Sequence, residues 1–155
     1  MGSELSHTEV VWGSAPAPRA APVRRIALER LHPEVIAAAS DLFVDEHYSQ
    51  AVFEACKALE VRVRAQSGLE LSGRVLMDKA LGGQVPPINV AVEEGQSGRD
   101  EQEGIRFLLM GVMQGIRNPK GHGLIRQDDP QRALEYLALV SILFRRLDDG
   151  AGAEA

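Results

Sequence analysis

One stretch near the C-terminus decides the fold: "ALEYLALVSILF", residues 133–144. It is apolar on most sides of a helical projection, and such a helix is buried among other helices or shared with a second subunit. Asp128, Asp129 and Pro130 precede it, which is an N-cap followed by a proline suited to the first helical turn. We therefore expect a central helix over residues 130–147.

Four further helices are predicted upstream, because apolar residues recur there at helical spacing. The first starts at Pro33, the second covers about 49–66 and ends at Gly68, a short third covers 73–80, and the fourth covers 100–116. The sequence thus predicts an all-α bundle of four main helices and a short one. The expected inward residues are Val35, Ala39, Leu42, Phe43, Val52, Ala55, Cys56, Leu59, Val63, Ile105, Leu108, Leu109, Val112, Met113 and Ile116. On the second helix we expect Glu54, Lys57, Glu60 and Arg64 to face solvent.

A long connection, "GGQVPPINVAVEEGQSGRDEQEG", precedes and enters the fourth helix at residues 82–104. Its two adjacent prolines and its glycines exclude a long helix over its first part. We expect an irregular loop there, with room for a small hairpin that turns at Glu94–Gly95. Loops of this length inside a compact domain are often functional.

The composition is that of one soluble globular domain: 155 residues, 45% hydrophobic and 25% charged. The net charge of −5 argues against a general polyanion binder. The single cysteine, Cys56, excludes an intramolecular disulfide and a cysteine metal cluster, and it is expected in the core. Because no run of 18 apolar residues and no signal sequence is found, we expect a cytoplasmic protein without a membrane partner.

Three segments are expected along the chain. Residues 1–30 are rich in proline and alanine without an apolar period, which predicts a flexible lead-in. Residues 31–149 form the helical domain, and residues 150–155 form a disordered tail.

The candidate site is "RNPKGH" at residues 117–122, where the fourth helix should end. Pro119 disfavours helical geometry at Asn118, so the helix should break there and bring His122 round beside Arg117. From residue 117 to 126 the chain carries two arginines, a lysine and a histidine but no acid, a composition that suits a phosphate. The alternative is that these cations only stabilise the carbonyl end of the helix.

The same stretches resemble a known family. "RNPKGH" at the end of the penultimate long helix, followed by a helix that starts at Asp–Pro, is similar to the HEPN superfamily. Residues 31–149 resemble more closely a family of uncharacterised bacterial proteins called Ymh-type. The matching stretches are "LHPEVIAAASDLF", "HYSQAVFEACKALEVRVR", "GIRNPKGH" and "DDPQRALEYLALVSILFRRLD".

The HEPN resemblance implies a helical bundle that forms a homodimer and acts as a metal-independent endoribonuclease, in a toxin or antiviral defence setting. It implies that Arg117 and His122 are the catalytic pair, with Asn118 as the accompanying polar residue, and that no cofactor or metal is needed. In toxin-type members a tyrosine lies two residues after the histidine. Leu124 holds that position here, so regulation through such a tyrosine is not expected.

Other polar residues are candidates for RNA contacts. Lys120 and Arg126 would add phosphate contacts beside the catalytic pair. His47 and Tyr48 follow the first helix and are candidates at the same end of the bundle, the alternative being a turn with a satisfied histidine. An acid on the second helix, Glu60, would orient His122 if it faced the cleft instead of solvent.

The expected chemistry is attack of the RNA 2′-OH on its own phosphate, which yields 2′,3′-cyclic phosphate and 5′-OH ends. An imidazole serves as acid or base at neutral pH, and a guanidinium matches two phosphate oxygens. The rival interpretation is a non-catalytic dimeric module that binds a nucleotide or a regulatory protein partner. The acidic net charge favours that rival, or else a narrow RNA substrate.

Overall fold

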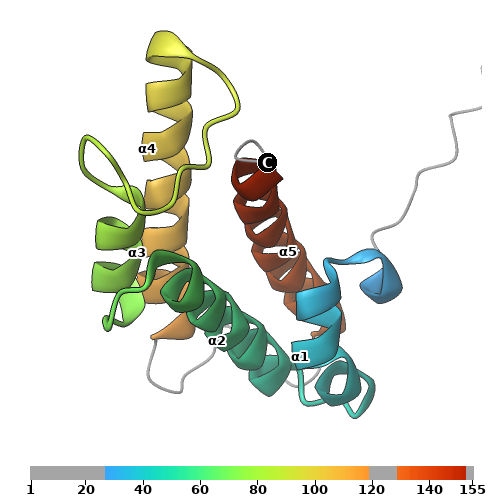
Figure 1. Ribbon diagram of the computed structural model, residues 1–155. Coiled ribbons are helices and arrows are strands. Elements are labelled where there is room, and N and C mark those ends of the chain that lie inside the picture. The colour runs from blue at the N-terminus through green and yellow to red at the C-terminus, as the bar shows by residue number, and fades with distance from the viewer. Residues whose placement is uncertain (1–26, 119–128, 153–155) are drawn as a thin grey trace, which may run out of the picture.

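The computed structural model describes residues 27–118 and 129–152, and these residues form helices and connecting segments without a β-strand (Figure 1). The fold is an all-α bundle, as the sequence predicts. The elements are η1 (Leu28–Arg30), α1 (Pro33–Val44), α2 (Tyr48–Ser67), α3 (Gly73–Leu81), α4 (Gly95–Val112), η2 (Met113–Arg117) and α5 (Pro130–Gly152).

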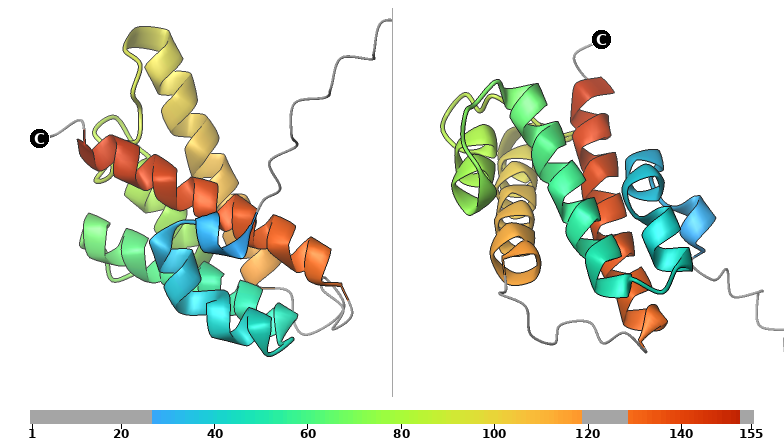
Figure 2. Two further views of the ribbon diagram at one scale, coloured as in Figure 1. Left: turned by 90° about the vertical axis from the view of Figure 1, so that its right-hand side faces the viewer. Right: turned by 90° about the horizontal axis from the view of Figure 1, so that it is seen from below.

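Helix α2 lies at the centre of the arrangement. It packs against α1, α3, η2 and α5, while α3 packs along α4. Seen from below, α3 and α4 lie on one side of α2, and α5 and α1 lie on the other side (Figure 2). Helix α5, which we expected at the centre, shares that position with α2: in the described part of the chain its opposite side stays open, and Ile142 there is 50% exposed.

The core confirms most of the apolar stripes. The buried residues of α2 include all five expected ones, and α5 buries Leu137, Val140, Phe144 and Leu147 completely. Leu108 is a correction, because its exposed fraction is 49%. Helix α4 turns the neighbouring Leu109 and Val112 inward, so Leu108 falls on the outward side beside Phe107.

Local signals place the start of α1, the end of α2 and the start of α5 where expected. The His32 Nδ1 atom accepts a hydrogen bond from the Glu34 backbone N–H at 3.2 Å, which caps α1 just before Pro33. Gly68 ends α2 in the left-handed conformation with φ of 71°. Asp129 Oδ1 accepts from the Arg132 N–H at 3.0 Å and so caps α5.

The segment between α3 and α4 contains no hairpin, and α4 begins at Gly95, five residues before the expected start. Side chains of α4 take the place of a partner strand. Gln102 donates to the Leu81 and Ile88 carbonyls, both at 2.9 Å, and accepts from the Val90 N–H at 2.8 Å. The backbone groups of an irregular segment must find partners, and here a helix supplies them.

The described domain is longer than residues 31–149 at both ends. Leu28 in η1 packs on the core, and α5 continues to Gly152. Gly150 is buried against the loop, since a Cβ atom there would lie 2.1 Å from the Asn89 carbonyl oxygen. The expected tail therefore starts later than residue 150. Residues 1–26 and 153–155, with most of the expected lead-in, lie outside the described residues.

Candidate functional site

The chain leaves α4 through a widened turn that carries Arg117. The Asn118 backbone N–H donates to the Met113 carbonyl oxygen, five residues back, at 3.1 Å. Such π-type turns are rare and often occur at functional sites. The helix ends at Arg117, one residue before the predicted break at Asn118.

The Arg117 guanidinium is held by a buried acid of α2. Arg117 Nη2 donates to Glu60 Oε2 at 2.7 Å, and Arg117 Nη1 donates to Asn118 Oδ1 at 3.1 Å. Glu60 is only 3% exposed, whereas the Arg117 side chain is 27% exposed. The expectation that Glu60 faces solvent is wrong. It lies one turn beyond Cys56 on the inward side of α2, where a carboxylate is tolerated because charged and polar partners surround it.

Two further groups bind the same carboxylate. The Gly73 backbone N–H at the start of α3 donates to Glu60 Oε1 at 2.6 Å, and Arg64 Nη2 lies 3.4 Å from that oxygen. Glu60 thus joins α2, the start of α3 and the end of the π turn. The only sequence signal for it was its place next to the inward stripe of α2.

Cys56 and part of the Arg117 side chain are buried beside this cluster. Burial raises the pKa of Cys56 to about 12, although the nearby positive charge of Arg117 acts in the opposite direction. Cys56 is therefore a protonated core residue at neutral pH and not a nucleophile. The Nε atom of Arg117 is buried and has no hydrogen-bond partner among the described residues.

The remaining candidates are distributed as follows. Asn118 is exposed beside Arg117, as expected. His47 is exposed at the start of α2, and Tyr48 is buried edge-on against Phe43 at 5.0 Å between ring centroids. Tyr48 precedes Glu60 by twelve residues of one helix, which is about 18 Å along its axis. The structure therefore does not bring His47 and Tyr48 to Arg117. Lys120, His122 and Arg126 lie outside the described residues, so their place beside Arg117 stays a prediction.

A second polar cluster ties α1, α2 and α5 together. The Nδ1 atom of His32 accepts from Glu34, so the neutral ring carries its proton on Nε2, which donates to Asp148 Oδ2 at 2.8 Å. Arg62 Nη2 donates to Asp148 Oδ1 at 2.6 Å, and Arg62 also pairs with Glu34. The polar groups of this cluster bind one another and connect three helices, which indicates a structural role.

We expect Asp148→Asn to lower the free energy of unfolding by less than about 1 kcal/mol, because the side chain is 46% exposed and screened by solvent. Burial acts to raise the pKa of Asp148, but the hydrogen bonds from His32 and Arg62 and the positive charge of Arg62 outweigh it, so the pKa lies below its ordinary value of 3.8. The carboxylate therefore stabilises the fold above about pH 4, and this contribution is lost as the pH falls through the lowered pKa.

Urea titrations of wild type and Asp148→Asn between pH 7 and pH 3 measure this difference. Asp149→Asn is the matched control, because Asp149 pairs with Arg146 at 3.2 Å and not with the His32 cluster. A difference that grew toward acid pH would contradict the prediction.

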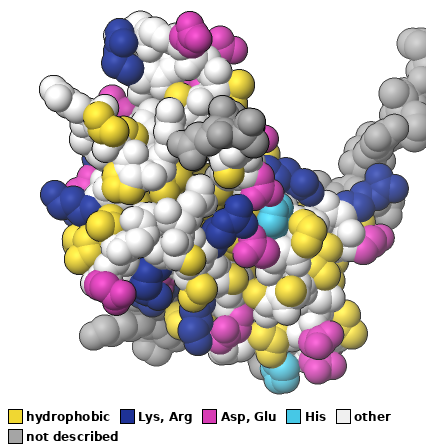
Figure 3. All heavy atoms as spheres, viewed as in Figure 1, with side chains coloured by type: hydrophobic (Ala, Val, Ile, Leu, Met, Phe, Trp, Pro, Cys, Tyr) yellow, Lys and Arg dark blue, Asp and Glu magenta, His cyan; other side chains and the backbone are white. Residues whose placement is uncertain are grey.

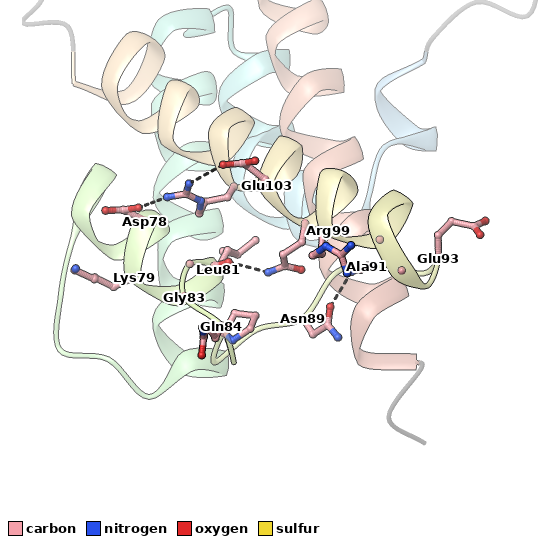
Figure 4. A pocket seen from close by; sticks show the side chains of 16 residues that line it. Asp78, Lys79, Leu81, Gly83, Gln84, Asn89, Ala91, Glu93, Arg99 and Glu103 are labelled. Atoms are coloured by element: carbon pink, nitrogen blue, oxygen red, sulfur yellow. Dashed lines mark hydrogen bonds and ion pairs between the residues drawn. The ribbon is translucent and has the colours of Figure 1, made fainter.

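A hollow of about 930 Å³ lies elsewhere, between α3, the 82–94 segment and the N-terminal half of α4 (Figure 4). Two of its polar side chains are bound within the fold: Arg106 pairs with Asp78 and Glu103, and Gln102 binds the loop backbone. Arg106 is eleven residues before Arg117, or about 16 Å along the helix axis. The hollow is therefore separate from the Arg117 cluster.

Two general features of the described residues bear on the site. No group of three or more His, Cys, Asp or Glu side chains in residues 27–118 and 129–152 is arranged to hold a metal ion. Within the same ranges, no helix combines the length and apolar character needed to cross a membrane.

Comparison with known proteins finds one family. A family model described as "Protein of unknown function (Hypoth_ymh)" matches residues 29–147. No curated protein and no solved structure matches the chain.

Proposed function

The chain belongs to the Hypoth_ymh family, whose function is unknown, and on this premise we propose that it is a metal-independent endoribonuclease of the HEPN type. The observation that carries the proposal is the Arg117 guanidinium, fixed at the end of a π turn by a buried carboxylate. A surface arginine that served only as a helix cap would not need a buried acid to orient it. The segment that follows it directly carries His122, Lys120 and Arg126.

In the proposed reaction, a His122 imidazole removes the proton of the RNA 2′-OH, and the 2′ oxygen attacks the adjacent phosphorus. The bond from phosphorus to the 5′ oxygen breaks, and a protonated imidazole donates a proton to that oxygen. Arg117 and Asn118 bind the non-bridging oxygens as negative charge develops on them. Lys120 and Arg126 are proposed to contact neighbouring phosphates.

A homodimer would supply the second histidine, one for each proton transfer. The outward face of α4 supports this proposal. Phe107 and Leu108 are 53% and 49% exposed there, and Gly111 in α4 and Gly115 in η2 are exposed one and two turns further along the same side. Glycines on a helix face allow a second backbone to approach closely, and exposed apolar side chains at the same place favour a covered state.

A narrow RNA substrate is proposed in place of general nucleic-acid binding. On the face shown in Figure 3, Lys and Arg side chains are interspersed with Asp and Glu and do not form a broad basic surface. Phosphate binding would then depend on the cations of residues 117–126, and the bound RNA would be selected by shape or by a loop.

The second candidate function is a non-catalytic dimeric module that binds a nucleotide or a regulatory protein. The exposed apolar face of α4 fits a dimer of either kind, and the acidic net charge of −5 favours the module. Expression separates the two: an active ribonuclease should slow the growth of its host, and His122→Ala should restore growth. Harmless expression of wild type together with intact RNA in vitro would favour the module.

The proposed function is tested by incubating purified protein with total RNA in excess EDTA. We expect cleavage to persist, because the 2′-OH is the nucleophile and the imidazole and guanidinium supply the remaining groups. Mapping of the ends should find 2′,3′-cyclic phosphate and 5′-OH. Cleavage that required added magnesium or manganese, or that left 5′-phosphate ends, would refute the mechanism.

A further inference from the structure

We infer that Glu60 is a positioning residue that holds the Arg117 guanidinium in the orientation needed to bind the scissile phosphate. The inference rests on the proposed function. It is drawn from the buried Glu60 carboxylate, in which both oxygens accept a hydrogen bond. Oε2 accepts from Arg117 Nη2 at 2.7 Å, and Oε1 accepts from the Gly73 N–H at 2.6 Å.

The contact with Gly73 is what makes the carboxylate rigid. Glu60 starts from the middle of a twenty-residue helix and reaches the first residue of α3 with one oxygen. Its other oxygen cannot swing away from Arg117 without breaking that bond. A functional group is held best by elements whose own positions are locked, and here two helices lock it.

The guanidinium keeps hydrogen-bond donors for a substrate. It has five N–H groups, of which Glu60 takes one on Nη2 and Asn118 takes one on Nη1. Within residues 27–118 and 129–152, one N–H on each terminal nitrogen has no partner, and we assign these two donors to phosphate oxygens. Their direction is set by Glu60, and a displacement of about 1 Å at a reacting centre costs on the order of 100-fold in rate.

Glu60→Gln is the decisive variant because it keeps the size of the side chain and removes one acceptor. A glutamine has one acceptor oxygen and one NH2 donor. Either the Gly73 N–H or the Arg117 guanidinium, both of which are donors, would then lie against the NH2 group and lose its hydrogen bond. We expect kcat for RNA cleavage to fall roughly 10- to 100-fold, with KM changed less than about threefold, because other cations carry ground-state binding. Cleavage of one defined RNA substrate under steady-state conditions measures both constants.

Two variants serve as controls. Glu54→Gln removes the same charge from the same helix, at a residue whose polar partners among the described residues are Gln50 and Lys57, and it should cleave like wild type. Glu60→Asp keeps both carboxylate oxygens on a shorter side chain and should keep part of the activity. Glu60→Asp also decides the question if Glu60→Gln fails to fold in a thermal melt: wild-type kcat in folded Glu60→Asp would overturn the inference.

A double-mutant cycle with Arg117→Lys distinguishes positioning from a general structural effect. A lysine ammonium has no planar fork to orient, so Glu60→Gln should cost less than about threefold in kcat in that background. An equal loss in both backgrounds, or wild-type kcat in Glu60→Gln, would overturn the inference.

Nuclear magnetic resonance of the arginine side chains separates this inference from the proposed function. The Arg117 Nη–H signals should be protected from exchange in wild type and lost in Glu60→Gln. Wild type that cleaves no RNA would refute the proposed function, while the Arg117 signals would still show whether Glu60 holds the guanidinium. Identical Arg117 signals in both proteins would overturn the inference even if RNA were cleaved.

Discussion

His122→Ala is expected to lower the rate of RNA cleavage about 10³-fold, and Arg117→Lys about 100-fold. General acid–base catalysis contributes roughly 10²–10⁴-fold, and one donor to a developing oxyanion contributes roughly 10²–10³-fold. Lysine keeps the positive charge of Arg117 but loses the planar fork, so the smaller loss would be due to geometry.

Lysine is chosen over alanine at this position because of Glu60. Arg117→Ala should also abolish cleavage, but it leaves a carboxylate that is 3% exposed without its main charged partner. Breaking a buried pair in this way costs about 3–5 kcal/mol of stability, so the loss of activity could reflect unfolding.

The control for both variants is Arg132→Ala, which removes a cation from the exposed start of α5. Arg132 is 54% exposed and pairs with Asp129, and its loss should leave cleavage unchanged. Single-turnover kinetics in EDTA measure the rates, and the combined variant should lose little more than His122→Ala alone if the two groups act together. Cleavage that survived both substitutions would show that the reaction occurs elsewhere or belongs to a contaminant.

Phe144→Ala is expected to lower the free energy of unfolding by about 3–5 kcal/mol, the range found when a fully buried phenylalanine is removed. Phe144 is completely buried in α5, and its ring stacks on His32 with centroids 4.9 Å apart. The cavity would lie where α5 meets the capped start of α1. Because a domain of this size is stable by only about 5–15 kcal/mol, much of the total would be lost.

Urea denaturation followed by circular dichroism measures this effect. Ile142→Ala is the matched control on the same helix, since Ile142 is 50% exposed and should cost less than about 1 kcal/mol. Equal losses in the two variants would mean that the side of α5 carrying Ile142 is also covered, for example by a second subunit.

The order of the helices could be predicted because its signals are local. Pro33, Gly68 and Pro130 act on their own turn of backbone, and the inward stripe of α2 depends only on residues three and four apart. These three helix ends were predicted correctly to within one or two residues, whereas α5 continues five residues beyond its predicted end at Leu147. The start of α4 was missed because Gly95 and Gly98 have low helix propensity, and Gly98 is needed where a Cβ would lie 2.1 Å from the Glu93 carbonyl oxygen.

The sequence by itself determined an all-α fold and pointed to Arg117 at the end of η2, which continues α4. Both predictions were possible because helix periodicity and a proline break depend only on residues close together in the chain. Only the tertiary structure decided that Glu60 is buried and that Leu108 is exposed. The reason is distance along the chain: Glu60 pairs with Arg117, which lies 57 residues later, and no residue within one turn of α2 indicates that partner. Burial of a charge depends on what packs against it, and that becomes defined only when the helices come together.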